Sequence, residues 1–142
     1  MRYWLLVFSV FLLFTAAAPA PDYAKELNKQ FMMIHLQEAA RLYNQGRISE
    51  AVEVAESTLK FAGDVLGPNH PDLATPLNNL ALLYQAQGEY AKAEPLYQKA
   101  IALQEQTTGF ETLELAKTFN NLALLDQLGA LAAAALSKSS AN

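Results

Sequence analysis

The sequence predicts an all-α fold, built as a solenoid of antiparallel helix pairs. One observation is a repeat: residues 78–83 and 120–125 both read Asn-Asn-Leu-Ala-Leu-Leu, 42 residues apart. Gly46 and Gly88 are separated by the same 42 residues. The other observation is spacing, because apolar residues between these glycines recur every three or four positions, as on one face of an α-helix. A fixed period in this range is typical of a repeat array.

The first repeat contains two predicted helices, over about residues 22–45 and 48–66. Gly46 lies between them, where a left-handed helix end favours glycine. Residues 67–72 then form a turn rich in helix-breaking and capping residues. His70 precedes Pro71 and Asp72, so we expect it to begin the next helix. A metal-binding role is not favoured, because His35 lies in a different helix.

The second repeat follows the same plan, with helices over about residues 71–87 and 90–108. Gly88 separates the two helices, and Gly109 follows the second one. Ala81 and Ala93 are small where the helices are expected to cross closely. A larger side chain there would push the helices apart.

The third repeat supplies one clear helix, over about residues 112–128. Gly129 then repeats the spacing that follows Gly88, so residues 129–142 are expected to form a degenerate second helix and a disordered tail. Leu122, Leu125 and Leu128 are expected to lack cover. Either the alanine-rich tail covers them or a second copy of the chain does, which makes a homodimer through this end an alternative.

Residues 77–100 carry the most specific motif, Leu-Asn-Asn-Leu-Ala-Leu-Leu-Tyr-x-x-x-Gly-x-Tyr-x-x-Ala-x-x-Leu-Tyr-x-x-Ala. Together with the linker at residues 66–72, this motif resembles the tetratricopeptide repeat, in the 42-residue variety of kinesin light chains. The resemblance covers roughly residues 36–127 and is weakest in the first repeat. It implies a right-handed α-solenoid of about two and a half repeats.

The resemblance also implies a groove, lined by the first helix of each repeat, that holds a protein or an extended peptide without a cofactor. Asparagines of the family bind the peptide backbone there, since an amide both donates and accepts hydrogen bonds. The matching positions are Asn78, Asn79, Leu82, Gln85, Lys117, Asn120, Asn121, Leu124 and Gln127. The first repeat departs from the pattern, with Leu36 and Gln37 at the paired-asparagine positions. Alternatively, the asparagines join adjacent helices and fix the stacking of repeats.

Composition excludes several other classes of function. The net charge is −4 and basic residues are not clustered, which argues against nucleic acids and anionic membrane surfaces as partners. The chain has no cysteine, and therefore no disulfide or thiolate metal site. Glu50, Glu53 and Glu56 follow helical spacing and are interpreted as a solvated face. Tyr43 and the other tyrosines of the repeats are assigned to packing, and no nucleophile elbow or phosphate loop occurs, so we predict no catalysis, metal or cofactor.

Residues 1–20 are typical of a signal peptide, with Arg2, an apolar stretch and small residues before Pro21. The apolar stretch of about 12 residues is short of the roughly 20 that a membrane-spanning helix needs. We therefore expect cleavage after Ala17, Ala18 or Ala20 and a secreted or periplasmic protein. A retained N-terminal membrane anchor is the alternative. The repeat domain would then occupy residues 22–128.

Three functions follow from these features. The first is an exported, non-catalytic adaptor or scaffold that binds proteins through the groove. The second is a structural element that associates with itself through the open third repeat. The third is the N-terminal part of a larger enzyme or signalling protein that contains such repeats.

Overall fold

The computed structural model describes residues 21–108 and 113–139. Within them the chain forms five α-helices and one short 3₁₀ helix, without a strand. These are α2 (Pro21–Asn44), α3 (Ile48–Leu66), η1 (Pro71–Leu73), α4 (Ala74–Ala86), α5 (Tyr90–Thr108) and α6 (Leu113–Ser139). The predicted all-α solenoid is thereby confirmed. The chain divides into two units between Phe31 and Met32, and the packing described below is that of the second unit.

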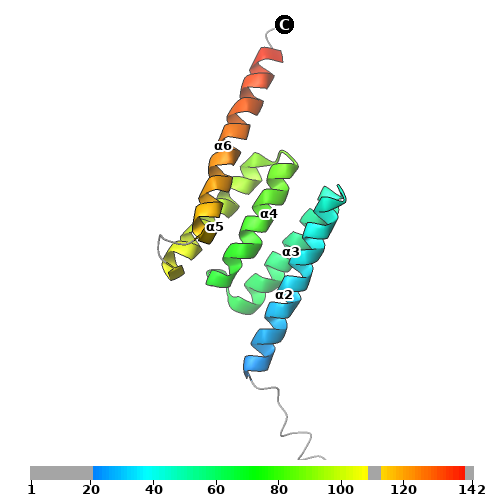
Figure 1. The fold of residues 1–142 in the computed structure, drawn as a ribbon, viewed down its shortest axis with the longest axis vertical. Coiled ribbons are helices and arrows are strands. Elements are labelled where there is room, and N and C mark those ends of the chain that lie inside the picture. The colour runs from blue at the N-terminus through cyan, green and yellow to red at the C-terminus, as the bar shows by residue number, and fades with distance from the viewer. Residues whose placement is uncertain (1–20, 109–112, 140–142) are drawn as a thin grey trace, which may run out of the picture. The chain divides into compact units, whose positions relative to one another are not determined.

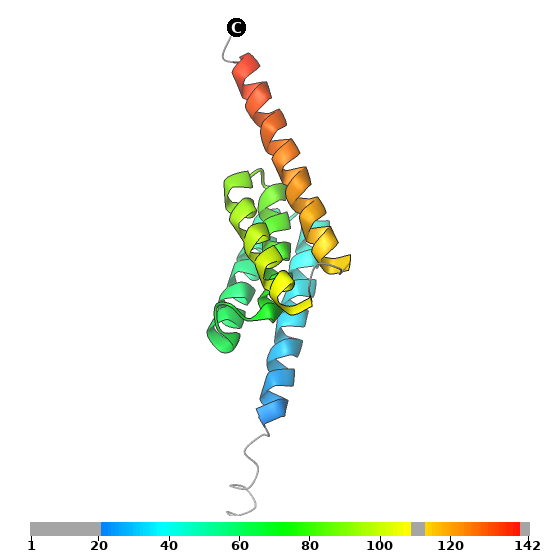
Figure 2. The same cartoon turned by 90° about the vertical axis from the view of Figure 1, so that its left-hand side faces the viewer.

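The helices of the second unit pack in chain order. Helix α4 lies between α3 and α5, and α6 packs mainly on α5, as Figure 1 and Figure 2 show from two directions. We call α2, α4 and α6 the A helices of the three repeats, and α3 and α5 the B helices of the first two. Neighbouring helices therefore supply each other's apolar cover, which is how a solenoid is stabilised.

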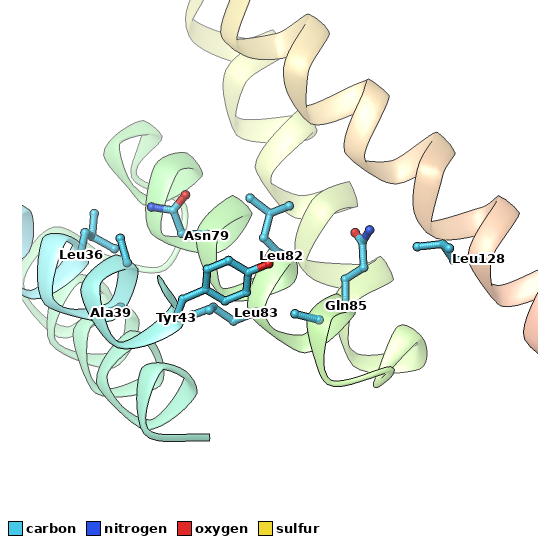
Figure 3. A pocket seen from close by; sticks show the side chains of 10 residues that line it. Leu36, Ala39, Tyr43, Asn79, Leu82, Leu83, Gln85 and Leu128 are labelled. Atoms are coloured by element: carbon cyan, nitrogen blue, oxygen red, sulfur yellow. The ribbon is translucent and has the colours of Figure 1, made fainter. Parts of the chain in front are cut away.

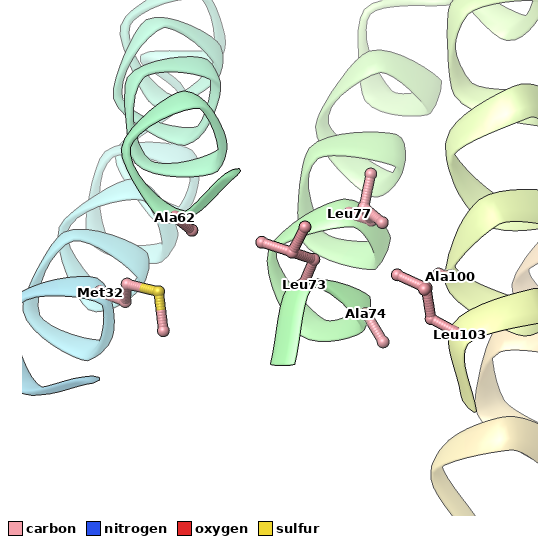
Figure 4. Packing of buried hydrophobic residues seen from close by; sticks show 7 residues of the cluster. All are labelled: Met32, Ala62, Leu73, Ala74, Leu77, Ala100 and Leu103. Atoms are coloured by element: carbon pink, nitrogen blue, oxygen red, sulfur yellow. The ribbon is translucent and has the colours of Figure 1, made fainter. Parts of the chain in front are cut away.

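The core consists of small and large apolar residues that interlock between helices. Ala81 and Ala93 have no exposed surface and share a cluster with Tyr97 and Leu125, so the predicted close crossing of α4 and α5 is confirmed. A second cluster, drawn in Figure 4, joins Met32 to α3, α4 and α5. Its members are Met32, Ala62, Leu73, Ala74, Leu77, Ala100 and Leu103.

Both A-to-B turns are closed in the same way. Gly46 and Gly88 have φ angles of 76° and 78°, in the left-handed region that favours glycine. The next amide in each turn donates back across the glycine, from Arg47 to the Leu42 carbonyl at 3.0 Å and from Glu89 to the Tyr84 carbonyl at 2.9 Å. This bond satisfies a carbonyl at the end of each A helix and fixes the direction of the B helix.

The start of the second repeat also follows the prediction. The amide of Asp72 donates a hydrogen bond to Nδ1 of His70 at 3.2 Å, and Pro71 opens η1. His70 thus satisfies one of the unpaired amides at a helix start, which confirms its predicted role.

The end of the third repeat differs from the prediction. Helix α6 continues through Gly129 to Ser139, so the expected break after Leu128 is wrong. Residues 130–136 are all alanine or leucine, the strongest helix formers, and none of them offers a polar cap. Residues 1–20, Gly109 and residues 140–142 lie outside the described part of the chain, so the signal peptide and the disordered tail stay predictions.

The exposed surface of the third repeat is also not where we expected it. Leu125 is only 2 % exposed and Leu122 packs against the same cluster, which includes Tyr97 of α5. Leu128 is half-buried. These leucines face the second repeat, and they do so because an A helix packs on the preceding pair as well as on its own B helix.

Candidate functional site

A pocket of about 380 Å³ lies between the A helices, as Figure 3 shows. Its lining residues are Leu36, Ala39, Ala40 and Tyr43 of α2, Asn79, Leu82, Leu83, Gln85 and Ala86 of α4, and Leu128 of α6. Pockets that bind small ligands or peptide side chains have volumes of roughly 300–1,000 Å³. The predicted face of the solenoid therefore carries a concave surface of the right size for a short apolar segment.

The pocket wall is mainly apolar, with two amides. Asn79 and Gln85 are both half-buried, and their side chains project from the same side of α4 as Leu82 (Figure 3). The Tyr97 hydroxyl donates to Oε1 of Gln85 at 2.9 Å. That bond fixes the Gln85 side chain, so its NH₂ group is the end that it can offer to a ligand.

Tyr97 supports the pocket from behind. Its ring is fully buried, and burial raises the pKa of its hydroxyl well above the ordinary value. The hydroxyl therefore stays a hydrogen-bond donor to Gln85 at physiological pH. Such fixed support is what holds a binding side chain in one orientation.

The predicted groove residues separate into two groups. Asn79, Leu82 and Gln85 line the pocket. Leu36, which replaces the first asparagine in the first repeat, lines it as well. The remaining predicted residues do not line it, and they are Asn78, Lys117, Asn120, Asn121, Leu124 and Gln127.

The asparagines outside the pocket have different surroundings. Nδ2 of Asn121 donates to Oδ1 of Asn78 at 3.2 Å, which joins α6 to α4. This is the stacking role that the sequence left open as the alternative. Asn120 is exposed, and Lys117 pairs with Glu114 at 3.2 Å. Leu124 and Gln127 are exposed on α6.

The sequence interpretation missed the α2 side of the pocket. Tyr43 was assigned to packing, but its side chain is 46 % exposed and lines the pocket. The repeat period could have identified it, since Tyr43 and Ala40 lie 42 residues before Gln85 and Leu82. Leu128 lies 42 residues after Ala86 by the same rule.

A polar contact beside the pocket joins the first two repeats. The Tyr84 hydroxyl of α4 donates to the carboxylate of Glu56 in α3, and Nζ of Lys92 lies 5.3 Å from the centre of the Tyr84 ring. The hydrogen bond to Glu56 raises the pKa of Tyr84 to about 12. Glu56 therefore does more than form a solvated face: it holds one repeat to the next.

Two further features concern ligands and membranes. In the part of the chain that the structure describes, no group of three or more His, Cys, Asp or Glu side chains gathers to hold a metal ion. Among the same residues, α6 is long and apolar enough to cross a membrane, judged by length and composition alone. Leu115 and Leu125 of α6 are nevertheless buried against the protein, and most of the helix is exposed.

Comparison with known proteins identifies the repeats. The family model described as "Tetratricopeptide repeat" matches residues 31–106 and 76–137. The Clustered mitochondria protein homolog of Kluyveromyces lactis is 29 % identical over 80 residues, which are 56 % of this chain and 6 % of that protein. The Protein-lysine N-methyltransferase SMYD4 of Danio rerio is 29 % identical over 108 residues, 76 % of this chain and 14 % of that protein.

A solved structure gives the same result. The crystal structure of BtubC (BKLC) from P. vanneervenii is similar with a TM-score of 0.64 and 26 % sequence identity, over 69 % of this chain and 39 % of that one. The chain thus spans only a small part of its curated relatives and less than half of this structure. The chain belongs to the tetratricopeptide repeat family, whose members are scaffolds for protein–protein interaction.

Proposed function

We propose that this protein is a non-catalytic adaptor that binds a partner protein by an apolar segment inserted between its A helices. The pocket between α2, α4 and α6 is the observation that carries the proposal. Its lining offers apolar surface, two amides and one phenol, which suits burial of an apolar side chain beside a hydrogen-bonded peptide unit.

The mode of binding differs from a continuous asparagine clamp. The first repeat contributes Leu36, Ala40 and Tyr43, and Asn121 already bonds to Asn78. Burial of apolar area therefore contributes most of the affinity, at about 25 cal/mol per Å² before the costs of association are subtracted. The two amides, Asn79 and Gln85, orient the segment and add hydrogen bonds.

A matched pair of variants tests this proposal. Leu82→Asp places a charge in the pocket wall at a site that is 38 % exposed, whereas Val65→Asp makes the same kind of change on α3, at 43 % exposure and outside the pocket. The tagged full chain and both variants are expressed in the organism's own cells, and captured proteins are identified by mass spectrometry. We expect a partner that Leu82→Asp loses and Val65→Asp keeps. A partner that both variants keep would contradict the use of the pocket.

We also propose that the protein is exported, because residues 1–20 have the charge, apolar length and small-residue exit of a signal peptide. Fractionation followed by N-terminal sequencing of the purified protein tests it. The expected N-terminus is Pro19, or a neighbouring residue after Ala17 or Ala20. An intact Met1 on membrane-bound protein would favour the anchor instead.

A further inference from the structure

The outer face of α6 repeats a surface that is buried in the second repeat. Ala74, Leu77 and Ala81 of α4 share clusters with residues of α5, and the residues 42 positions later are Ala116, Phe119 and Ala123. The α4 residues are 5 %, 2 % and 0 % exposed. Their counterparts in α6 are all exposed, and the Phe119 side chain is 45 % exposed. The third repeat therefore presents a surface shaped for a B helix.

The second repeat shows what fits such a surface. Helix α5 runs antiparallel to α4 (Figure 1) and brings Ala93 and Tyr97 into one cluster with Ala81. Small residues allow the two helix backbones to approach, and the larger neighbours then interlock around them. A helix that covers α6 should likewise run antiparallel and present small residues.

The C-terminal half of α6 has these properties itself. No residue from Gln127 to Ser137 is charged, and five of these residues are alanine at positions 130 and 132–135. The segment is also poorly covered, since Leu131 is 67 % exposed and Leu136 is 72 % exposed. An exposed helical stretch with this composition is typical of an interaction surface.

We propose that two copies of the protein pair through antiparallel α6 helices. With 3.6 residues per turn, Ala116, Ala123, Ala130 and Ala134 lie on one side of α6. When Ala123 faces Ala134 of the second copy, the two-fold axis lies near Gly129, and the reciprocal contact forms at the same time. The antiparallel α4–α5 packing is thus continued between copies, with Ala123 of each copy against Ala134 of the other.

In this register the residues nearest the two-fold axis, 127–130 of each copy, carry no charge, and Asp126 lies just outside them. The aliphatic stem of Lys138 lies over Phe119 of the other copy with its ammonium group in solvent. Burial of the alanine face and of the exposed Phe119 side chain drives the pairing. A second copy is therefore the occupant with matching chemistry.

A membrane is a poorer occupant of this surface. The first half of α6 is held by α4 and α5, so about 10 residues from Ala130 onward stand clear, a length of about 15 Å. The hydrocarbon core of a bilayer is about 30 Å thick.

Leu128 lines the pocket from another side of α6, so the pairing leaves both pockets open. The dimer would then offer two pockets to one partner.

Crosslinking tests the proposed register, because the chain has no cysteine of its own. Full-length Ala123→Cys and Ala134→Cys are mixed, oxidised or treated with a short bis-maleimide, and separated without reductant. We expect a disulfide-linked pair of chains. Ala132→Cys mixed with Ala123→Cys is the matched control, since residue 132 lies on the opposite side of the helix, and it should give several-fold less product. Equal yields would overturn the proposal.

Two further measurements exclude the other occupants. In the double variant Ala123→Cys/Ala134→Cys, a link within one chain would show that α6 folds back, because these positions are about 16 Å apart in a straight helix. Sedimentation equilibrium should give a dimer, and Ala123→Asp should raise its dissociation constant at least about tenfold while the circular dichroism is unchanged. A monomeric chain that instead sediments with lipid vesicles would assign the surface to a membrane and overturn the pairing.

Discussion

The same substitution at two repeat-equivalent alanines should have very different costs. Ala81 has no exposed surface and lies under α5, whereas Ala123, 42 residues later, is exposed on α6. We therefore compare Ala81→Leu with Ala123→Leu. Each change adds the same atoms to a helix interior, and the intrinsic helix preference of leucine is close to that of alanine. The difference between them measures how well a B helix covers each site.

The magnitude follows from the packing. At Ala81 the added atoms have no space between α4 and α5, and overpacking of this kind costs about 1–3 kcal/mol. For a domain of about 100 residues, each kcal/mol lowers Tm by about 4–8 °C. Ala123→Leu should change the free energy of unfolding by less than about 0.5 kcal/mol in the monomer.

Thermal unfolding followed by circular dichroism compares the two variants at a concentration where the chain is monomeric. Gel filtration of each variant confirms the monomeric state. The reasoning would be refuted by an unchanged Tm in Ala81→Leu. It would also be refuted by an equal loss of Tm in Ala123→Leu, since that would place a covering helix over α6.

Three further predictions concern the turn, the asparagines and pH. Gly88→Ala should lower the free energy of unfolding by about 1–2 kcal/mol, because the φ angle of Gly88 is positive. Gly129→Ala should raise it by up to about 1 kcal/mol, because Gly129 lies inside helix α6. A less stable Gly129→Ala protein would mean that the helix breaks at that residue. Asn121→Ala should lower the free energy of unfolding in urea by about 1 kcal/mol, because it leaves the side-chain carbonyl of Asn78 unpaired. Asn120→Ala should leave it unchanged, because Asn120 is exposed. Equal effects of the two substitutions would contradict the stacking role of Asn121. Because the pKa of Tyr84 is raised in the folded protein, its protonated hydroxyl contributes fully to stability below pH 10, and this contribution is lost as the pH rises towards 12. Tm should therefore fall over this range, and it should fall less in Tyr84→Phe. An identical pH dependence in both proteins would contradict the bond to the carboxylate.

The repeat period alone predicted most of the fold. Helix pairs, the glycine turns and the alanine crossing follow from local rules that each repeat obeys independently, such as the positive φ at Gly46 and Gly88. The behaviour of Gly129 could not be predicted in the same way. Its surroundings resemble those of Gly88 in sequence, but a turn is stable only when the following helix has a face to bury, and that depends on contacts distant in sequence.

The candidate site was predicted in part. Asn79, Leu82 and Gln85 follow from their place on an A helix, and they line the pocket. The position of Asn121 could not be foreseen, because the amide can bind either a peptide or a neighbouring helix, and only the approach of α6 to Asn78 decides. Tyr43 was missed because tyrosine also fits a packing role.

Site-specific photocrosslinking tests the central claim most directly. A photoreactive amino acid replaces Leu82 in the pocket wall or Val65 on α3, in the full chain expressed in its own cells. The account predicts a crosslink from position 82 to one partner protein, absent at position 65 and lost when Tyr43→Asp is added. Crosslinking at position 65 alone, or at position 82 regardless of Tyr43→Asp, would contradict binding in the pocket between the A helices.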